Sequence, residues 1–282
     1  ILHDAYDEMN YGDLTKINPQ DLPDFDVMIA GFPCQTFSVI GQRKGFEDER
    51  GQIIYSLIEI LSAKNVSYFI LENVKGLINH DKGKTLKTIL FALNDAGYKV
   101  EYKVLNSNRY GVPQMRERIY FIGIRKDKLN KKVFRWATPK NLPNIRDYLC
   151  DDNSPILNKN DKTFIKYLNN KYNQGKFNLE ELLKQDYLVL DTRQSDLRIY
   201  KEMVPTLRTG RHGILYVKKG ELHKLTGYES LLLQGFDRDY VNKIKDKISE
   251  THLLSQAGNA MTVSIIESLA KSLVNYIGDD NE

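Results

Sequence analysis

The stretch Asp26-Val-Met-Ile-Ala-Gly-Phe-Pro-Cys-Gln35 decides the fold. It begins with a continuous apolar run and turns polar after Pro33. A short apolar run that ends in glycine and proline is typical of a strand buried on both faces, because such strands lack polar alternation. A second apolar run, Tyr68 to Leu71, follows a segment with apolar side chains at helical spacing, Ile53 to Ala63. We therefore expect a strand, a helix and a strand here.

The same alternation continues further along the chain. Residues 85–96 have helical periodicity, and Gly97 is a plausible stop signal. Apolar runs at residues 100–104 and 119–124 indicate two more strands. Continuous apolar strands separated by helices imply a sheet that is covered on both faces. The sequence thus predicts a doubly wound α/β fold with a mainly parallel sheet.

The pattern changes after Lys126. Residues 127–186 are rich in Asn, Lys and Tyr and weakly periodic, which favours loops with one helix near residues 178–184. Short strand patterns return in residues 187–217, and further helices are expected at 228–233 and 262–277. We therefore expect one domain from residues 1–126 plus 252–282, and a smaller β-rich domain with a hinge from residues 127–251.

Charge is unevenly distributed along the chain. The net charge is +4, but residues 127–225 contain 20 Lys and Arg against 12 Asp and Glu, a net of +8, and the remainder has a net of −4. A basic segment of this kind suits contact with a polyanion. It also suits an ordinary solvated surface, and charge alone does not decide between the two.

Composition excludes several classes of protein. No apolar run approaches the roughly 20 residues needed to cross a bilayer, and no signal peptide is visible. The two cysteines, Cys34 and Cys150, cannot form a disulfide framework or a four-ligand zinc site by themselves, so we expect no structural metal and a reducing compartment. The first residue is Ile1, so we expect that the native start lies upstream.

Two reactive side chains follow predicted strands. Cys34 comes just after the first strand, and Glu72 ends the second. Open α/β sheets place their active sites at the carboxyl ends of parallel strands, so the two side chains are expected at one edge. A cysteine in a loop is more often structural than nucleophilic, and a carboxylate at a strand end is often a cap. Together, however, they form a candidate nucleophile and acid.

Two further motifs contain polar groups suited to ligands. Arg116 and Arg118 alternate in a segment that enters a strand, so we expect both on one side, facing an anion, a thiolate or a nucleobase carbonyl. Structural ion pairs are the alternative. The segment Gln256 to Met261 contains Gly-Asn before the last helix, where a turn would expose N–H groups to a ligand or simply cap the helix.

In order and spacing, these motifs resemble the C5-cytosine DNA methyltransferase family of prokaryotic restriction-modification systems. The matching elements are Pro33-Cys-Gln35, Gly45-Phe-Glu-Asp-x-Arg-Gly51, Glu72-Asn-Val74, Gln114-x-Arg116-x-Arg118 and Gly258-Asn-Ala260. Tyr11-Gly-Asp-Leu14 and the segment from Arg198-Ile-Tyr to Pro205-Thr-Leu-Arg208 resemble two further family elements. The resemblance spans nearly the whole chain. It implies a class I methyltransferase fold with a small target-recognition domain.

The resemblance also implies a mechanism. Cytosine C5 becomes nucleophilic once the Cys34 thiolate has attacked C6 and broken the aromaticity of the ring. Glu72, protonated or sharing a proton, would bond N3 and the exocyclic amine, while Arg116 and Arg118 would stabilise the O2 side or hold the thiolate. C5 then takes the methyl group of S-adenosylmethionine, giving S-adenosylhomocysteine. Loss of the C5 proton expels Cys34.

Further contacts follow from the resemblance. The target base must be flipped out of duplex DNA, under a mobile loop formed by residues 37–51. The basic insert from Asp127 to about Asp186 would read the major groove. Cofactor contacts are expected at Asp13, Leu14, Pro33, Ile53, Asn259, Ala260 and Met261. Contacts to cytosine or DNA are expected at Phe32, Gln35, Ser38, Asn73, Gln114, Arg208 and Arg211. The resemblance implies a bacterial cytoplasmic enzyme associated with the nucleoid, and no membrane.

The chain departs from the family pattern in three places. The Gly-rich Phe-x-Gly-x-Gly-Gly loop and the ribose-binding acid that should precede Gly12 are absent, so we expect truncation or a separate N-terminal fragment, and weak cofactor binding by this chain alone. Ile40 stands where some relatives have a polar residue, which puts in doubt how the loop fills the hole left by the base. The recognition region is short, which fits one compact target.

Two alternative functions remain. A tRNA cytosine-5 methyltransferase would usually have a Cys-Phe-Thr signature near the recognition region, and the sequence has none. A non-catalytic DNA-binding partner would be expected to lose Cys34, Glu72 or the arginines, and all of them are present.

Overall fold

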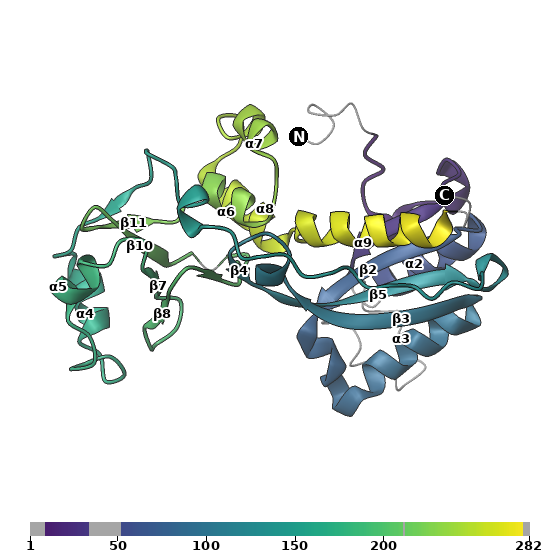
Figure 1. Ribbon diagram of the computed structural model, residues 1–282, viewed down its shortest axis with the longest axis horizontal. Helices are drawn as coiled ribbons and strands as arrows, with labels where there is room; N and C mark the ends of the chain where they lie inside the picture. The colour runs from purple at the N-terminus through teal and green to yellow at the C-terminus, as the bar shows by residue number, and fades with distance from the viewer. Residues whose placement is uncertain (1–8, 34–51, 211, 279–282) are drawn as a thin grey trace. The chain divides into compact units, whose positions relative to one another are not determined.

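The computed structural model describes residues 9–33, 52–210 and 212–278, and they fall into two compact units (Figure 1). The unit that we call the α/β unit consists of residues Leu2–Leu105, Glu117–Ala137 and Ile266–Glu282. The β-rich unit consists of Asn106–Arg116 and Thr138–Ile265. The functional partition into residues 1–126 plus 252–282 and residues 127–251 remains a prediction.

The α/β unit contains a four-stranded sheet in the order β1-β2-β5-β3. The strands are β1 (Val27–Gly31), β2 (Tyr68–Val74), β3 (Tyr98–Asn106) and β5 (Glu117–Arg125). β1 runs parallel to β2, with Gly31 opposite Glu72, whereas β5 is antiparallel to β2. The predicted α/β class is confirmed, but the four strands are mixed in direction. The 107–116 segment joins β3 to β5 without the long helical crossover that parallel neighbours require.

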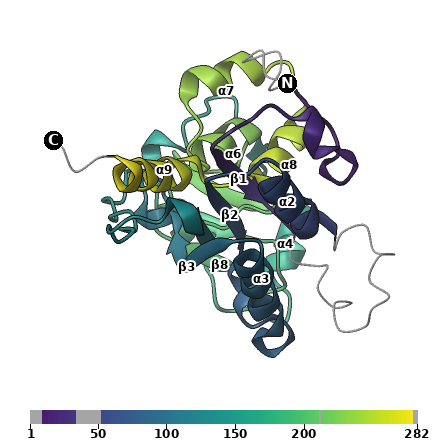
Figure 2. The same ribbon diagram turned by 90° about the vertical axis from the view of Figure 1, so that its right-hand side faces the viewer.

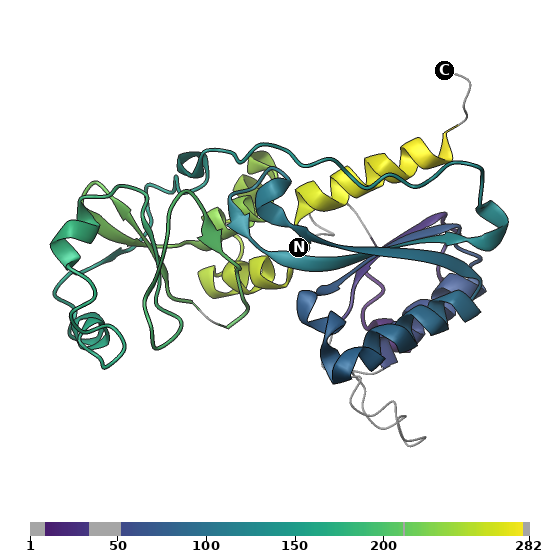
Figure 3. The ribbon, with the colours of Figure 1, turned by 60° about the horizontal axis from the view of Figure 1, so that its bottom comes forward.

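Helices cover both faces of this sheet. α2 (Gln52–Ala63) and α3 (Lys84–Asp95) pack on one face, and α9 (Val263–Ile277) lies on the side away from α3 (Figures 1 and 3). Short 3-10 turns complete the unit: η1 (Leu14–Lys16), η2 (Pro19–Asp21), η4 (Lys75–Ile78), η5 (His80–Gly83) and η7 (Lys126–Lys128). Gly97 follows α3 with φ of 94°, so the predicted stop signal is confirmed.

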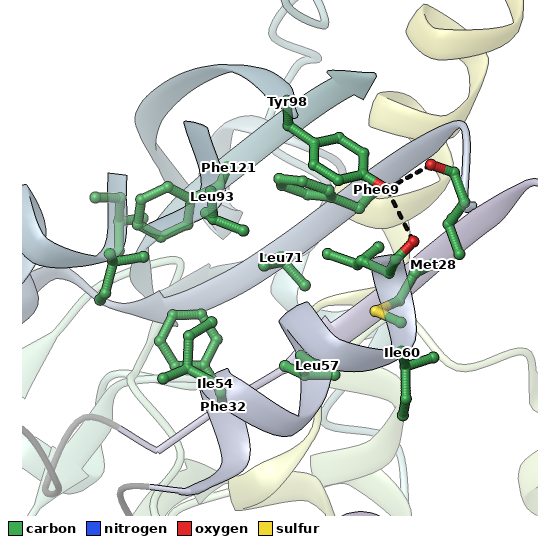
Figure 4. Close-up of a cluster of buried hydrophobic side chains, with 14 of the residues drawn as sticks. Met28, Phe32, Ile54, Leu57, Ile60, Phe69, Leu71, Leu93, Tyr98 and Phe121 are labelled. Carbon is green, nitrogen blue, oxygen red and sulfur yellow. Dashed lines mark hydrogen bonds between the residues drawn. The ribbon is translucent and has the colours of Figure 1, made fainter. Parts of the chain in front are cut away.

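The core of the α/β unit lies between the sheet and the α2–α3 layer (Figure 4). Apolar side chains from β1, β2, α2 and α3 meet there. The Tyr98 ring packs against Phe69, and its hydroxyl donates to the carbonyls of Leu61 and Val66. Burial raises the pKa of Tyr98 to about 12, so it stays a neutral donor that ties the end of α2 to β3.

β1 is at one end of the described sheet (Figure 2), and two of its side chains, Val27 and Ile29, are partly exposed. Val27 is 39% exposed and Ile29 is 43% exposed, whereas Met28 is only 8% exposed in the core. Among the residues that the structure describes, β1 pairs with β2 alone, so the main-chain groups on its other side can accept a further strand.

The β-rich unit contains a five-stranded sheet in the order β6-β11-β10-β7-β8 and a two-stranded parallel pair of β4 and β9. The strands are β4 (Gln114–Met115), β6 (Ile156–Leu157), β7 (Val189–Asp191), β8 (Arg198–Tyr200), β9 (Val204–Pro205), β10 (Ile214–Lys218) and β11 (Glu221–Lys224). The ladders of the larger sheet are antiparallel. The predicted short strands in residues 187–217 are confirmed.

Short helices surround these strands. They are η6 (Ser107–Arg109), η8 (Ile145–Asp147), α4 (Lys162–Leu168), α5 (Leu179–Leu183), α6 (Gly227–Leu233), α7 (Arg238–Ile244) and α8 (Glu250–Asn259). α5 and α6 match predicted helices, whereas the sequence patterns did not indicate α4, α7 or α8. None of the helices in the described part of the chain is long and apolar enough to cross a membrane.

Candidate active site

Cys34, Gln35, Ser38, the whole 37–51 loop and Arg211 lie outside the described residues. The segment that leads into Cys34 is held firmly, however. Phe32 is 6% exposed, its ring lies 6.3 Å from that of Phe121, and its N–H donates to the Glu72 carbonyl at 3.3 Å. The Asn73 amide donates to the Phe32 carbonyl at 2.9 Å. The end of β1 is therefore fixed beside the end of β2.

Glu72 and Arg118 form an ion pair within the α/β unit. Arg118 Nε lies 3.1 Å from Glu72 Oε1, and both side chains are largely buried. The antiparallel register of β2 and β5 places Val74 opposite Arg118 and Glu72 opposite Tyr120, so the two side chains share one face of the sheet. Glu72 therefore lies in β2 two residues before its end at Val74, opposite Gly31 of β1.

Three predicted contacts to cytosine or DNA have buried side chains that hold the main chain. Asn73 is 1% exposed and binds both Phe32 and the Val74 N–H. Phe32 is part of the core. Gln114 is fully buried in the β-rich unit, where it donates to the Leu233 carbonyl and accepts from the Leu207 N–H. In this structure the Asn73 and Gln114 side chains bind main-chain groups within their own units.

The sequence predicts that Arg116 and Arg118 lie on one side of an extended segment, but the structure gives the two side chains different surroundings. β4 ends at Met115 and β5 begins at Glu117, so strand alternation does not hold across residue 116. Arg116 is 2% exposed. Its guanidinium donates to the carbonyls of Leu207 at 3.1 Å, Gly258 at 3.2 Å and Ala260 at 2.8 Å, all within the β-rich unit. These three contacts are to main-chain carbonyls, whereas Arg118 pairs with the Glu72 carboxylate.

Residues 204–210, which we call the strap, run past Arg116. Pro113 and Met115 bind the strap through β4 and β9, and Gln114 and Arg116 bind Leu207. Arg193 donates to the Thr206 carbonyl at 2.9 Å. The Arg193 guanidinium also binds both carboxylate oxygens of Asp191 at 2.7 Å, and this buried pair lowers the pKa of Asp191 despite the opposing effect of burial. Arg208 remains exposed.

The sequence predicts a turn at a helix start for the Gly-Asn motif, and the structure does not have this turn. Gly258 and Asn259 are the last residues of α8. A Cβ at Gly258 would lie 2.4 Å from Thr209 N and 2.6 Å from Arg208 C. The glycine is therefore required by the close approach of the strap to the helix. The main-chain groups that the motif presents to Arg116 are carbonyls.

The predicted cofactor contacts fall into both units. Asp13 is the N-cap of η1, and hydrogen bonds from the Thr15 hydroxyl and N–H hold its pKa below the ordinary value. Leu14 and Ile53 are partly buried against the core, and Pro33 is exposed at the end of β1. Asn259, Ala260 and Met261 belong to the β-rich unit.

A buried polar network was not foreseen from the sequence. The fully buried Glu229 accepts from Tyr216 Oη at 2.8 Å, and Tyr216 Oη lies 3.0 Å from Ser154 Oγ, which contacts His223 Nδ1 at 2.6 Å. Burial raises the pKa of Glu229 to about 7, although hydrogen bonds from Thr226 and Asp151 oppose the shift. Glu229 also completes the capping box of α6 with Thr226, and the Thr-x-x-Glu spacing is the sequence signal that could have revealed it.

No group of three or more His, Cys, Asp or Glu side chains that could hold a metal ion occurs among residues 9–33, 52–210 and 212–278.

Comparisons with known proteins agree on the family. Residues 1–275 match the family model of the C-5 cytosine-specific DNA methylases. The chain is 37% identical over 274 residues to the type II methyltransferase M.Bsp6I of Bacillus sp. (strain RFL6), which covers 93% of this chain and 82% of the relative. It is 34% identical over 273 residues to M1.ScrFI of Lactococcus lactis subsp. cremoris, covering 95% of this chain and 67% of that relative.

Solved structures show the same fold. The Entamoeba histolytica methyltransferase EhMeth matches with a TM-score of 0.67 and 17% identity, covering 98% of this chain and 86% of that one. The S. pombe Dnmt2 methyltransferase matches with a TM-score of 0.64 and 19% identity, covering 96% and 85%. From the family match over nearly its whole length, the chain belongs to the C-5 cytosine-specific DNA methylases, and it is a DNA cytosine-5 methyltransferase that uses S-adenosylmethionine as its methyl donor.

Proposed function

We propose that Cys34 attacks C6 of a cytosine flipped out of a specific duplex DNA sequence, while Glu72 and Arg118 stabilise the ring. The Glu72–Arg118 ion pair is the observation that best supports this assignment. It lies near the end of β2, whose Glu72 carbonyl and Asn73 side-chain amide also bind Phe32, two residues before Cys34. A carboxyl and a guanidinium near a thiol are the groups that this chemistry needs.

In the proposed reaction, the Cys34 sulfur forms a bond to C6, and the ring electrons move toward N3 and O2. Glu72 delivers or shares a proton at N3 and accepts from the exocyclic amine, which relieves the growing negative charge. Arg118, already paired with Glu72, is placed to stabilise O2. S-adenosylmethionine, when bound, supplies the methyl group. A base then removes the C5 proton, the C6–sulfur bond breaks, and the thiolate leaves.

We assign the holding of the cofactor to Asp13, Leu14, Pro33 and Ile53 and to Asn259, Ala260 and Met261. Asp13 is an exposed carboxylate whose pKa the Thr15 hydrogen bonds lower further, and it can accept from an amine. Leu14, Pro33 and Ile53 offer the apolar contacts. Asn259, Ala260 and Met261 would contact the methionine end.

The DNA is assigned to the basic part of the chain, within residues 127–251. The strap supports this proposal, because its main chain is bound on several sides while the Arg208 side chain remains exposed. Arg208, with Arg211 beyond the described part, would contact phosphates, and Gln35 and Ser38 would contact the flipped base. The same proposal places the enzyme in the bacterial cytoplasm, at the nucleoid.

The exposed edge of β1 supports a further partner segment. We propose that a strand bearing the Gly-rich cofactor motif adds to this edge, either from upstream in the same polypeptide or from a separate fragment. Val27 and Ile29 would then be covered. This chain alone should therefore bind S-adenosylhomocysteine weakly, and tight binding in a calorimetric titration would contradict the proposal.

Covalent trapping tests the proposed function. The chain, completed with a Gly-rich segment and supplied with S-adenosylmethionine, is incubated with mixed-sequence duplex DNA in which cytosine is replaced by 5-fluorocytosine. The fluorine cannot leave as a proton does, so the adduct accumulates. We expect a denaturation-resistant complex through Cys34.

The chain contains its own matched control. Cys150 is a partly buried free thiol in the β-rich unit. Cys34→Ala should abolish the complex and Cys150→Ala should leave it intact. An adduct that survives Cys34→Ala would refute the mechanism. Trapping on fluorinated tRNA in place of DNA would favour the RNA alternative, and binding without any adduct would favour the non-catalytic one.

A further inference from the structure

The strap and the end of α8 are in direct contact within the β-rich unit, and one residue of the strap lies between the proposed DNA contact and the proposed cofactor contact. Thr209 follows the exposed Arg208, and its hydroxyl donates to Asn259 Oδ1 at 2.6 Å. We propose that Thr209 is a positioning residue that couples DNA binding at the strap to the orientation of Asn259. The inference rests on the proposed function, which assigns Arg208 to DNA and Asn259 to the cofactor.

The hydrogen bond fixes which end of the Asn259 amide faces outward. An amide has an acceptor oxygen at one end and a donor nitrogen at the other. Because the oxygen accepts from Thr209, the nitrogen is turned away from the strap, toward solvent and any ligand on that side. Thr209 Oγ1 also lies 3.3 Å from the Ser255 carbonyl, so the same hydroxyl reaches the last turn of α8.

The strap and the end of α8 are closely packed. The 2.4 Å separation between a notional Gly258 Cβ and Thr209 N shows main chain packed against main chain. Arg116 binds the Leu207 carbonyl on the strap and the Gly258 and Ala260 carbonyls at the helix end with one guanidinium. A displacement of the strap on phosphate contact would therefore be passed to the end of α8.

Coupling of this kind is reciprocal. If DNA binding at the strap stabilises the outward donor of Asn259, a ligand on Asn259 must strengthen DNA binding by the same factor. The expected coupling factor is about five, because the Thr209–Asn259 hydrogen bond is a single bond and one net hydrogen bond changes an equilibrium constant by about that factor.

Amide hydrogen exchange with this chain tests the inference without any cofactor. The Ala260 N–H donates to the Gln256 carbonyl at 2.8 Å, so its exchange reports opening of the end of α8. A mixed-sequence DNA duplex should slow exchange at Ala260 about fivefold in the unmodified chain. Thr209→Ser, which keeps the hydroxyl, should retain this effect. Thr209→Val, which keeps the shape but loses the hydroxyl, should reduce it to less than twofold.

Two controls separate the inference from the function on which it rests. Thr88→Val removes a threonine hydroxyl that donates to the Lys84 carbonyl at 3.1 Å in α3, outside the segment assigned to DNA, and should behave like the unmodified chain. The coupling alone would be overturned if, in Thr209→Val, the duplex protects the strap amides from exchange and still slows exchange of the Ala260 amide fivefold. Duplex that fails to protect the strap in the unmodified chain would overturn the DNA assignment and the coupling together.

Discussion

Glu72→Gln should lower the rate constant for methylation by about 10²–10⁴-fold, the usual contribution of a positioned acid. The amide keeps the size of the carboxyl group and can still accept from Arg118 Nε, which lies 3.1 Å from Glu72 Oε1. It cannot deliver a proton to the cytosine ring. Because Glu72 is only 8% exposed, water cannot readily replace the lost acid. The loss should therefore appear in single-turnover methylation of duplex DNA by the completed enzyme, with DNA affinity little changed.

Glu117→Gln is the matched control. Glu117 is the first residue of β5, and its carboxylate lies 2.9 Å from Lys75 Nζ on the exposed surface. Exposed ion pairs contribute about 0–1 kcal/mol, so this change should leave the methylation rate within about twofold of the unmodified enzyme. A Glu72→Gln enzyme that retains a third or more of its single-turnover rate would show that another group protonates the ring.

The position of Glu72 could be predicted from the sequence because two local signals agreed. An apolar run marked β2, and glutamate stood where that run ended. The parallel β1–β2 pair then placed the ends of both strands at one edge. The antiparallel insertion of β5 could not be predicted, because apolar runs look alike in both strand directions. Its register, which pairs Val74 with Arg118, depends on tertiary contacts that no local pattern encodes.

The Gly-Asn motif shows why helix ends are difficult to predict. Glycine and asparagine commonly follow helices, and they are costly inside them. α8 includes both because the strap requires the space that a side chain at Gly258 would fill. The small helices α4 and α7 also escaped prediction, although Asp161 and Asp237 cap them. Each has only 7 residues, so helical periodicity has little room to show.

Arg116→Met should destabilise the β-rich unit by about 3 kcal/mol or more, since each buried carbonyl left without a donor costs about 1–3 kcal/mol. Methionine fills similar space but cannot donate to Leu207, Gly258 and Ala260 as the guanidinium does. Such a loss is a large fraction of the 5–15 kcal/mol by which domains are typically stable. A urea titration, monitored by amide exchange in α8, should show that Arg116→Met unfolds at a lower urea concentration than the unmodified chain. The midpoint for Arg116→Lys should lie between those of Arg116→Met and the unmodified chain, because a single ammonium cannot span three carbonyls.

Arg198→Met is the control that shows how much stability is lost when an exposed arginine is replaced by methionine. Arg198 is an exposed residue of β8 whose partner is Asp196, with 45% and 48% of the two side chains exposed. Its replacement should change stability by no more than about 1 kcal/mol. If Arg116→Met unfolds like the unmodified chain and yet methylates DNA 100-fold more slowly, Arg116 acts on the cytosine ring itself, as the family resemblance implies. If the loss of activity follows the loss of folded β-rich unit, Arg116 serves the reaction by holding the strap against α8, and Arg118 is the arginine that faces the ring.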